Sequence, residues 1–228
     1  MSAAELPEPD YLTPVRQAVL AAALPHIPFD GWSEAVLNRA ITESGVDAGR
    51  ALLAFPDGVM HLLEAFWVSL DAALCREIAR HGLQEPRLSG RIAGALKIYI
   101  SLLRPHREAV RRALALQALP QNAPGALMRL YRTVDVIWRA VGDQSTDFNF
   151  YTKRATLAAV VASVVTHWLA EGDGDSGQMD GFIERRVGNV LEFEKLKARI
   201  GGLTGHLPSP GPLLGRLAGR LTGAFRWP

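Results

Sequence analysis

The histidines, acids and single cysteine of this chain complete no familiar catalytic or metal-binding motif. No two of its six His lie four residues apart, and His61 and Glu64 share a helix face without the second Glu and Glu-x-x-His pair of a di-iron site. Cys75 is the only cysteine, which excludes an intramolecular disulfide and a Cys-based zinc site. No G-x-S-x-G nucleophile motif is present. We therefore expect no catalytic residues, no bound metal and no cofactor.

One glycine-rich segment imitates a nucleotide-binding motif. Residues 172–177, GDGDSG, match the spacing G-x-G-x-x-G. A dinucleotide site needs this motif between a strand and a helix, whereas here it follows a helical pattern, and its two aspartates would repel a pyrophosphate. The segment also lacks the later ligands of a calcium-binding loop. We interpret it as an ordinary loop.

The end of the chain has the composition of a helix that lies in a membrane interface. Over residues 213–228 the apolar residues occupy one helical face, and three arginines with no acid occupy much of the other. A Gly- and Pro-rich linker over residues 201–212 precedes it. The alternative is a helix packed on the protein's own body or on a second copy. The residues predicted to contact the membrane are Leu213, Leu214, Arg216, Leu217, Arg220, Leu221 and Phe225.

Charge is distributed unevenly along a chain that is nearly neutral overall. The net charge is +2, yet the residues from Lys195 onward carry six basic side chains and no acid. Residues 1–194 are therefore acidic, with a net charge of −4. This balance argues against a basic surface over the whole chain for nucleic acid, and it favours contact between the tail and an anionic lipid surface.

The elements that must position these residues are all helices. Apolar residues recur every three or four positions, and no segment alternates as a strand does. The sixteen residues 155–170 are too few to span a bilayer and predict a buried helix. Helix starts are marked by capping residues at Ser33, Asp47 and Asp57, and at Ser145 or Thr146. The fold class is all-α.

Four regions are expected from helix length and composition. Short helices fill residues 1–56, and longer helices that suit a bundle fill residues 57–200. The linker over residues 201–212 and the tail helix over residues 213–228 follow. Residues 1–10 contain three acids and no base, unlike a secretory signal or a mitochondrial leader.

The order of the first helices resembles the N-terminal domain of TetR-type regulators. In those proteins a recognition helix enters the major groove of DNA. Here the corresponding segment, residues 47–54, reads DAGRALLA, so Arg50 is the one residue suited to a phosphate contact and Asp47 would repel one. A DNA reader needs several phosphate contacts. We expect no nucleic acid partner, and a TetR-type ligand-responsive transcriptional regulator is the alternative function.

Two longer motifs carry a closer resemblance. Residues 24–33 read LPHIPFDGWS, and residues 134–155 contain VD, IW, GD and STDFNFYTKRA in that order. Together they resemble the lipid-binding accessory proteins of ubiquinone biosynthesis, a TetR-like family without DNA-binding activity. The resemblance covers about residues 12 to 200 in element order.

The resemblance implies a non-enzymatic homodimer with a hydrophobic pocket for an isoprenoid quinone intermediate or a phospholipid. It also implies that the protein presents its lipid to the di-iron hydroxylase that acts on demethoxyubiquinone. The segment DFNFYTKRA corresponds to part of the family's surface for that enzyme, with Phe150 where most members have Trp. Helical spacing places Asp147, Tyr151 and Arg154 within about 60° of one another, on what we expect to be an exposed face. The predicted partner-binding residues are Asp147, Phe150, Tyr151 and Arg154.

The alternative without a partner is that this segment is only the first turn of a helix, with a capping Asp and an ordinary i,i+4 pair of surface side chains. Candidate pocket aromatics are Phe66, Trp67, Trp138 and Trp168, although the sequence does not assign any of them to the pocket. With no mitochondrial leader in the sequence, the resemblance predicts a bacterial protein, cytoplasmic and peripheral on the inner face of the cytoplasmic membrane.

Overall fold

The computed structural model describes residues 11–142, 149–171 and 177–189, with side chains omitted at 149–152. Within these ranges the regular secondary structure is helical and no strand is present, which confirms the predicted fold class. The described residues all belong to one compact unit. The predicted linker and tail helix lie outside the described residues, as does Asp147, and the predicted region boundaries stay predictions.

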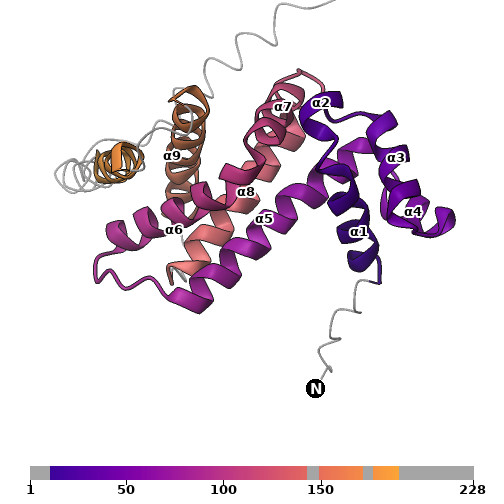
Figure 1. Ribbon diagram of the computed structural model, residues 1–228. Helices are drawn as coiled ribbons and strands as arrows, with labels where there is room; N and C mark the ends of the chain where they lie inside the picture. Colours follow the sequence, from indigo (N-terminus) through magenta and orange to yellow (C-terminus); the bar gives the residue numbers. More distant parts are fainter. Residues whose placement is uncertain (1–10, 143–148, 172–176, 190–228) are drawn as a thin grey trace, which may run out of the picture. The chain divides into compact units, whose positions relative to one another are not determined.

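Four short helices begin the chain: α1 (Thr13–Ala23), α2 (Ile27–Asp30), α3 (Glu34–Ser44) and α4 (Ala48–Ala54). The Ser33 hydroxyl accepts a hydrogen bond from the Val36 amide at 3.3 Å, and the Asp47 carboxylate accepts one from the Arg50 amide at 3.0 Å. Both predicted caps are therefore confirmed. Figure 1 shows α1 packed beside α3 and α4.

The remaining described helices form the body of the unit. They are α5 (Val59–His81), α6 (Leu88–Leu103), the 3₁₀ turn η1 (Arg104–His106), α7 (Arg107–Gln117), α8 (Ala123–Ala140), α9 (Asn149–Glu171) and a helix over residues 177–189. The long helix α5 packs against α6 and α8 and also against α1, and α8 packs against α9 (Figure 1). Helix α5 therefore links the N-terminal helices to the body.

Among the described helices no single one is long and apolar enough to cross a bilayer. Helices α4 and α5 reach the length and apolar composition of a membrane-spanning segment only when they are taken together, and the chain bends by 73° between them. The buried faces of α5 pack inside the protein.

An aromatic cluster joins the N-terminal helices to the body. The Trp32 ring lies 5.3 Å from the Phe66 ring of α5, and the Trp32 indole N–H donates to the Ala109 carbonyl of α7 at 3.0 Å. The Phe66 ring also contacts the rings of Trp67 and His106. These contacts fix the part of α5 that carries Trp67.

The start of α5 differs from the sequence prediction. The N-cap residue is Gly58, with φ of 56°, so the prediction of Asp57 as the cap is wrong. The Glu34 carboxylate, which comes from α3, accepts the Val59 amide at 2.8 Å and occupies the place where a side chain on Gly58 would begin. The Asp57 amide instead donates to Nδ1 of His61 at 3.0 Å.

Replacing Glu34 with Ala should therefore lower the free energy of unfolding by about 1 kcal/mol, because the first amide of α5 loses its acceptor. Replacing Asp57 with Ala should cost less, since its carboxylate does not cap the helix. Urea unfolding of the two variants beside the parent protein checks this difference. An equal or larger loss at Asp57 would show that the cap assignment is mistaken.

Candidate functional site

A cavity of about 360 Å³ lies in the helical body among α5, α6, α7, α8 and α9. Its walls are mainly apolar side chains, and small residues at the α7–α8 corner and on α9 leave space that larger ones would fill. The larger apolar and aromatic wall residues are Trp67, Tyr99, Leu114, Leu127, Leu130, Val161 and Val165. The alanines on the wall are Ala118, Ala123, Ala126 and Ala162.

A second cavity of about 210 Å³ adjoins the first and is more polar. The two share four wall residues, Trp67, Gln117, Ala126 and Arg129, while acids and a histidine of α5 and the turn before it line the second. The apolar cavity therefore has a polar end, and that end lies at Arg129.

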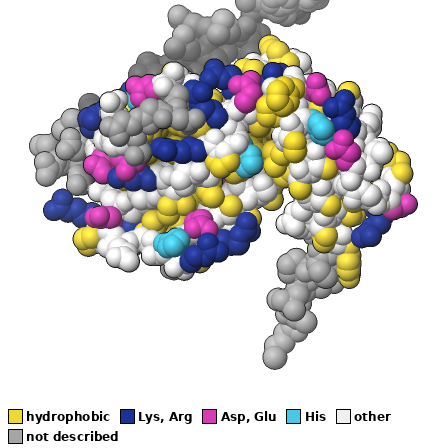
Figure 2. Space-filling view, in the orientation of Figure 1, with side chains coloured by type: hydrophobic (Ala, Val, Ile, Leu, Met, Phe, Trp, Pro, Cys, Tyr) yellow, Lys and Arg dark blue, Asp and Glu magenta, His cyan; other side chains and the backbone are white. Residues whose placement is uncertain are grey.

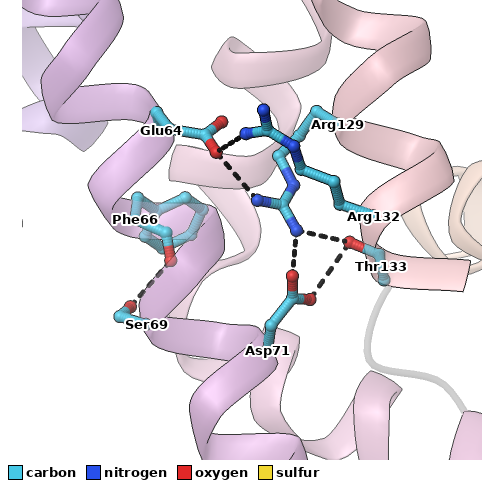
Figure 3. A network of polar contacts seen from close by, with 7 residues as sticks. All are labelled: Glu64, Phe66, Ser69, Asp71, Arg129, Arg132 and Thr133. Atoms are coloured by element: carbon cyan, nitrogen blue, oxygen red, sulfur yellow. Dashed lines mark hydrogen bonds and ion pairs between the residues drawn. The ribbon is translucent and has the colours of Figure 1, made fainter. Parts of the chain in front are cut away.

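Arg129 of α8 is the centre of a buried polar network that ties α8 to α5 (Figure 3). Its guanidinium donates to the Glu64 carboxylate at 2.9 Å and to the Asp71 carboxylate, and its side chain is only 7% exposed. The Thr133 hydroxyl donates to the other Asp71 oxygen at 3.0 Å, and Arg132 reaches Glu64 from the exposed side at 2.8 Å. Each buried charge in the network therefore faces an opposite one.

Burial dominates the electrostatics of this network. It raises the pKa of Asp71 to about 6, although the Arg129 charge and the Thr133 hydrogen bond act in the opposite direction. Burial also raises the pKa of the Tyr99 hydroxyl, and the Asp71 carboxylate adds to that effect. Tyr99 is therefore an uncharged hydroxyl on the cavity wall at every physiological pH.

The raised pKa of Asp71 predicts a pH-dependent stability. Because the folded protein holds this proton more tightly than the unfolded chain does, stability is greatest below the unfolded pKa of 3.8 and falls as the pH rises through about 6. The full change is about 3 kcal/mol.

Comparing the parent protein with Asp71→Asn isolates this effect, because the amide does not titrate. We expect the stability of the parent relative to the variant to fall between about pH 4 and pH 7. Urea unfolding of both proteins across that range provides the measurement. A constant difference would mean that Asp71 has the same pKa in the folded and unfolded chains.

The structure changes the interpretation of the predicted partner face. The Arg154 side chain is only 2% exposed, and its Nε and Nη2 donate to the Asp135 carboxylate of α8 at 2.8 and 2.6 Å. The expectation that Arg154 is exposed is wrong, because α8 covers it. Phe150 and Tyr151 lie in the first turn of α9, with side chains outside the described residues, and their predicted role in partner binding stays a prediction.

Of the four candidate pocket aromatics, Trp67 lines the cavity and the other three do not. Phe66, Trp138 and Trp168 are buried in the core. The polar end of the cavity was not predicted from the sequence. One signal was present, because Asp71 and Arg129 are charged residues on the apolar faces of helices, where an unpaired charge is costly.

Helix α4 occupies the place of the TetR recognition helix but has an apolar exterior. Leu52 is 74% exposed and Leu53 68%, while the Asp47 carboxylate is used to cap the helix. On the face in Figure 2, acidic and basic side chains are interspersed, with hydrophobic ones gathered between them. Neither α4 nor this face has the concentration of positive charge that phosphate contacts require.

Comparisons with known proteins agree with this architecture. Residues 123–194 match the COQ9 family model. The chain is 30% identical over 185 residues to the ubiquinone biosynthesis protein COQ9, mitochondrial, of Homo sapiens, which covers 78% of this chain and 58% of that protein. It is 26% identical over 196 residues to the Drosophila melanogaster protein of the same name, covering 83% of this chain and 59% of that protein. The chain thus spans less than two thirds of the length of these relatives.

A solved structure shares the fold. The TetR transcriptional regulator from Nitrosomonas europaea superimposes with a TM-score of 0.61 at 18% identity, covering 78% of this chain and 98% of that one. A likeness at this identity supports the fold and carries no function. The chain therefore has a TetR-like all-α fold and is similar over most of its length to the COQ9 ubiquinone biosynthesis proteins, with the match to the COQ9 family model at residues 123–194.

Proposed function

We propose that this protein is a non-enzymatic, lipid-binding accessory protein of ubiquinone biosynthesis. Homology to COQ9 proteins supports the pathway, and the apolar cavity of about 360 Å³ supports the binding of an isoprenoid quinone intermediate. The cavity is the observation that carries the proposal, because side chains of five helices leave an apolar space that a tightly packed core would have filled.

The size of the cavity limits how much of the ligand it holds. Its volume is at the small end of the roughly 300–1,000 Å³ typical of sites for drug-sized ligands. A quinone ring with the first part of its tail fits this space, whereas a long polyprenyl chain does not. The rest of the tail leaves past Leu127, which lines the cavity and is 68% exposed at the start of α8.

In this proposal the other regions bring the lipid to its enzyme. The tail helix over residues 213–228 holds the protein on the inner face of a bacterial cytoplasmic membrane, and a homodimer presents the quinone intermediate to the di-iron hydroxylase. The ion pair of Arg154 with Asp135 fixes the start of α9 on α8. Arg154 therefore positions the turn that carries Phe150 and Tyr151, and these two aromatics contact the hydroxylase.

Replacing Tyr151 with Asp should remove the hydroxylase from the purified complex, because a charge at an aromatic contact must be desolvated without a partner. Co-purification of the tagged protein with the co-expressed hydroxylase measures the loss, and circular dichroism verifies the fold. Replacing Ala170 with Asp is the control, because Ala170 is exposed at the other end of α9 and lies outside the segment DFNFYTKRA, and this change should leave the complex intact. Undiminished co-purification of the Tyr151 variant would remove this face from the proposal.

Uptake of quinone from liposomes tests the proposed function itself. The lipid-free protein is incubated with liposomes that contain ubiquinone, and flotation then separates the protein that is not bound to liposomes. We expect extraction of the protein fraction to yield quinone at up to one molecule per chain. Protein that takes up no quinone would contradict the carrier function.

A further inference from the structure

We propose that Trp67 and Arg129 form a head-group site at the polar end of the cavity, and that this site takes an uncharged hydrogen-bond acceptor such as a quinone carbonyl. The inference rests on the proposed lipid binding and adds the chemistry of recognition to it. Both residues are only 6% exposed, and both line the two adjoining cavities.

Each of the two side chains has a buried N–H donor without a hydrogen-bond acceptor among the described residues. These donors are the indole Nε1 of Trp67 and the Nε of Arg129. Leaving a buried N–H unpaired costs stability, so native proteins seldom keep two such groups beside one cavity without a use for them. A ligand atom that pairs with them recovers that cost on binding.

The two groups select the type of ligand atom. An indole N–H and a guanidinium N–H can only donate, so the partner must be an acceptor. A quinone carbonyl or a methoxy oxygen meets this requirement. A pure hydrocarbon does not, and it would leave both donors unpaired.

The surrounding charges select a neutral acceptor over an anionic one. Arg129 already faces the carboxylates of Glu64 and Asp71, so its positive charge is compensated before any ligand arrives. Arg132 also pairs with Glu64, so two arginines balance two carboxylates and the cluster offers a phosphate group no net positive charge. A phospholipid head group is therefore disfavoured, and a neutral quinone ring is favoured.

The wall of the cavity can admit such a ring. Both nitrogens are sealed from solvent, so an acceptor reaches them only when a neighbouring side chain yields. Gln117 borders both cavities and is only half-buried, and its unbranched side chain can change rotamer at low cost. From the donors the walls run along α8 and α9, where Leu130, Val161 and Val165 contact the start of the tail.

Two tryptophan variants test the donor. Trp67→Phe keeps an aromatic ring on the cavity wall and removes the buried indole N–H. Trp168→Phe is a matched control, because the Trp168 indole N–H is equally buried and also has no partner among the described residues, yet Trp168 does not line the cavity. The probe is decylubiquinone, and its dissociation constant is measured by isothermal titration calorimetry on the full chain.

We expect Trp67→Phe to weaken decylubiquinone binding about tenfold, the usual cost of one lost buried hydrogen bond, and Trp168→Phe to leave it unchanged. Arg129→Lys keeps the charge but removes the Nε–H, and it should weaken binding in the same direction. If Trp67→Phe fails to fold, the affinity of Arg129→Lys for decylubiquinone tests the head-group site instead. Equal binding by the parent and these variants would overturn the head-group site while leaving lipid binding intact.

A comparison of ligands tests the charge argument. The parent protein should bind decylubiquinone more tightly than a short-chain phosphatidylglycerol, and Trp67→Phe should not change the binding of dodecane, which has no acceptor. Preferential binding of the phospholipid would overturn the neutral-acceptor inference. Failure of the parent protein to bind any of the three ligands would instead contradict the proposed function.

Discussion

Replacing Arg129 with Met should lower the free energy of unfolding by about 3–5 kcal/mol, the range seen when one partner of a buried ion pair is removed. The loss arises because the Asp71 carboxylate, which is buried beside Thr133, would then lack its counter-charge. A raised pKa already shows that burial disfavours the charged form of Asp71. The free energy of unfolding in urea at about pH 7.5 measures the effect.

Two further variants separate the buried ion pair from ordinary surface charge. Arg132→Met removes an arginine that is 58% exposed and bonded to the same Glu64, so it should cost less than about 1 kcal/mol. The double variant Asp71→Leu with Arg129→Met removes both buried charges and should recover much of the lost stability. A double variant as unstable as Arg129→Met would show that packing, and not an uncompensated charge, causes the loss.

Replacing Ala126 with Phe should abolish most quinone binding while the protein still folds. Ala126 lines both cavities and is half-buried, so a phenyl ring at this position projects into the space that the ligand needs. We expect the dissociation constant for decylubiquinone to rise at least about tenfold, which corresponds to ~1.4 kcal/mol. Calorimetric titration of the variant provides the measurement.

Ala159→Phe is the control for the added ring. Ala159 is an exposed residue of α9 that does not line the cavity, so the same ring there should leave binding unchanged. Thermal unfolding of both variants verifies that they fold. Unchanged affinity in Ala126→Phe would mean that the ligand binds elsewhere on the protein.

Features that depend on neighbouring residues in the chain could be predicted from the sequence. Ser33 and Asp47 cap the helices that they precede, because each side chain reaches an amide three residues ahead. Asp57 has the same local pattern but does not cap α5, because Glu34 reaches the Val59 amide from another helix. The periodicity of one segment does not reveal which side chain from another helix will accept the first amide of α5.

The same limit explains what could and could not be predicted of the candidate site. Helical spacing places Arg154 on one face of α9, but it does not reveal that Asp135 of α8 covers that face. The polar end of the cavity is likewise built from α5 and α8, with Asp71 and Arg129 far apart in sequence. An apolar pocket could be inferred from family resemblance, whereas its lining depends on how five helices pack.

If this protein carries an isoprenoid quinone, its native cargo should contain one. The protein is purified from its own host, measured by native mass spectrometry and extracted with organic solvent. We expect a bound mass that matches a polyprenyl quinone intermediate, at up to one per chain. Lipid-free protein that also takes up no quinone from loaded liposomes would contradict the carrier function.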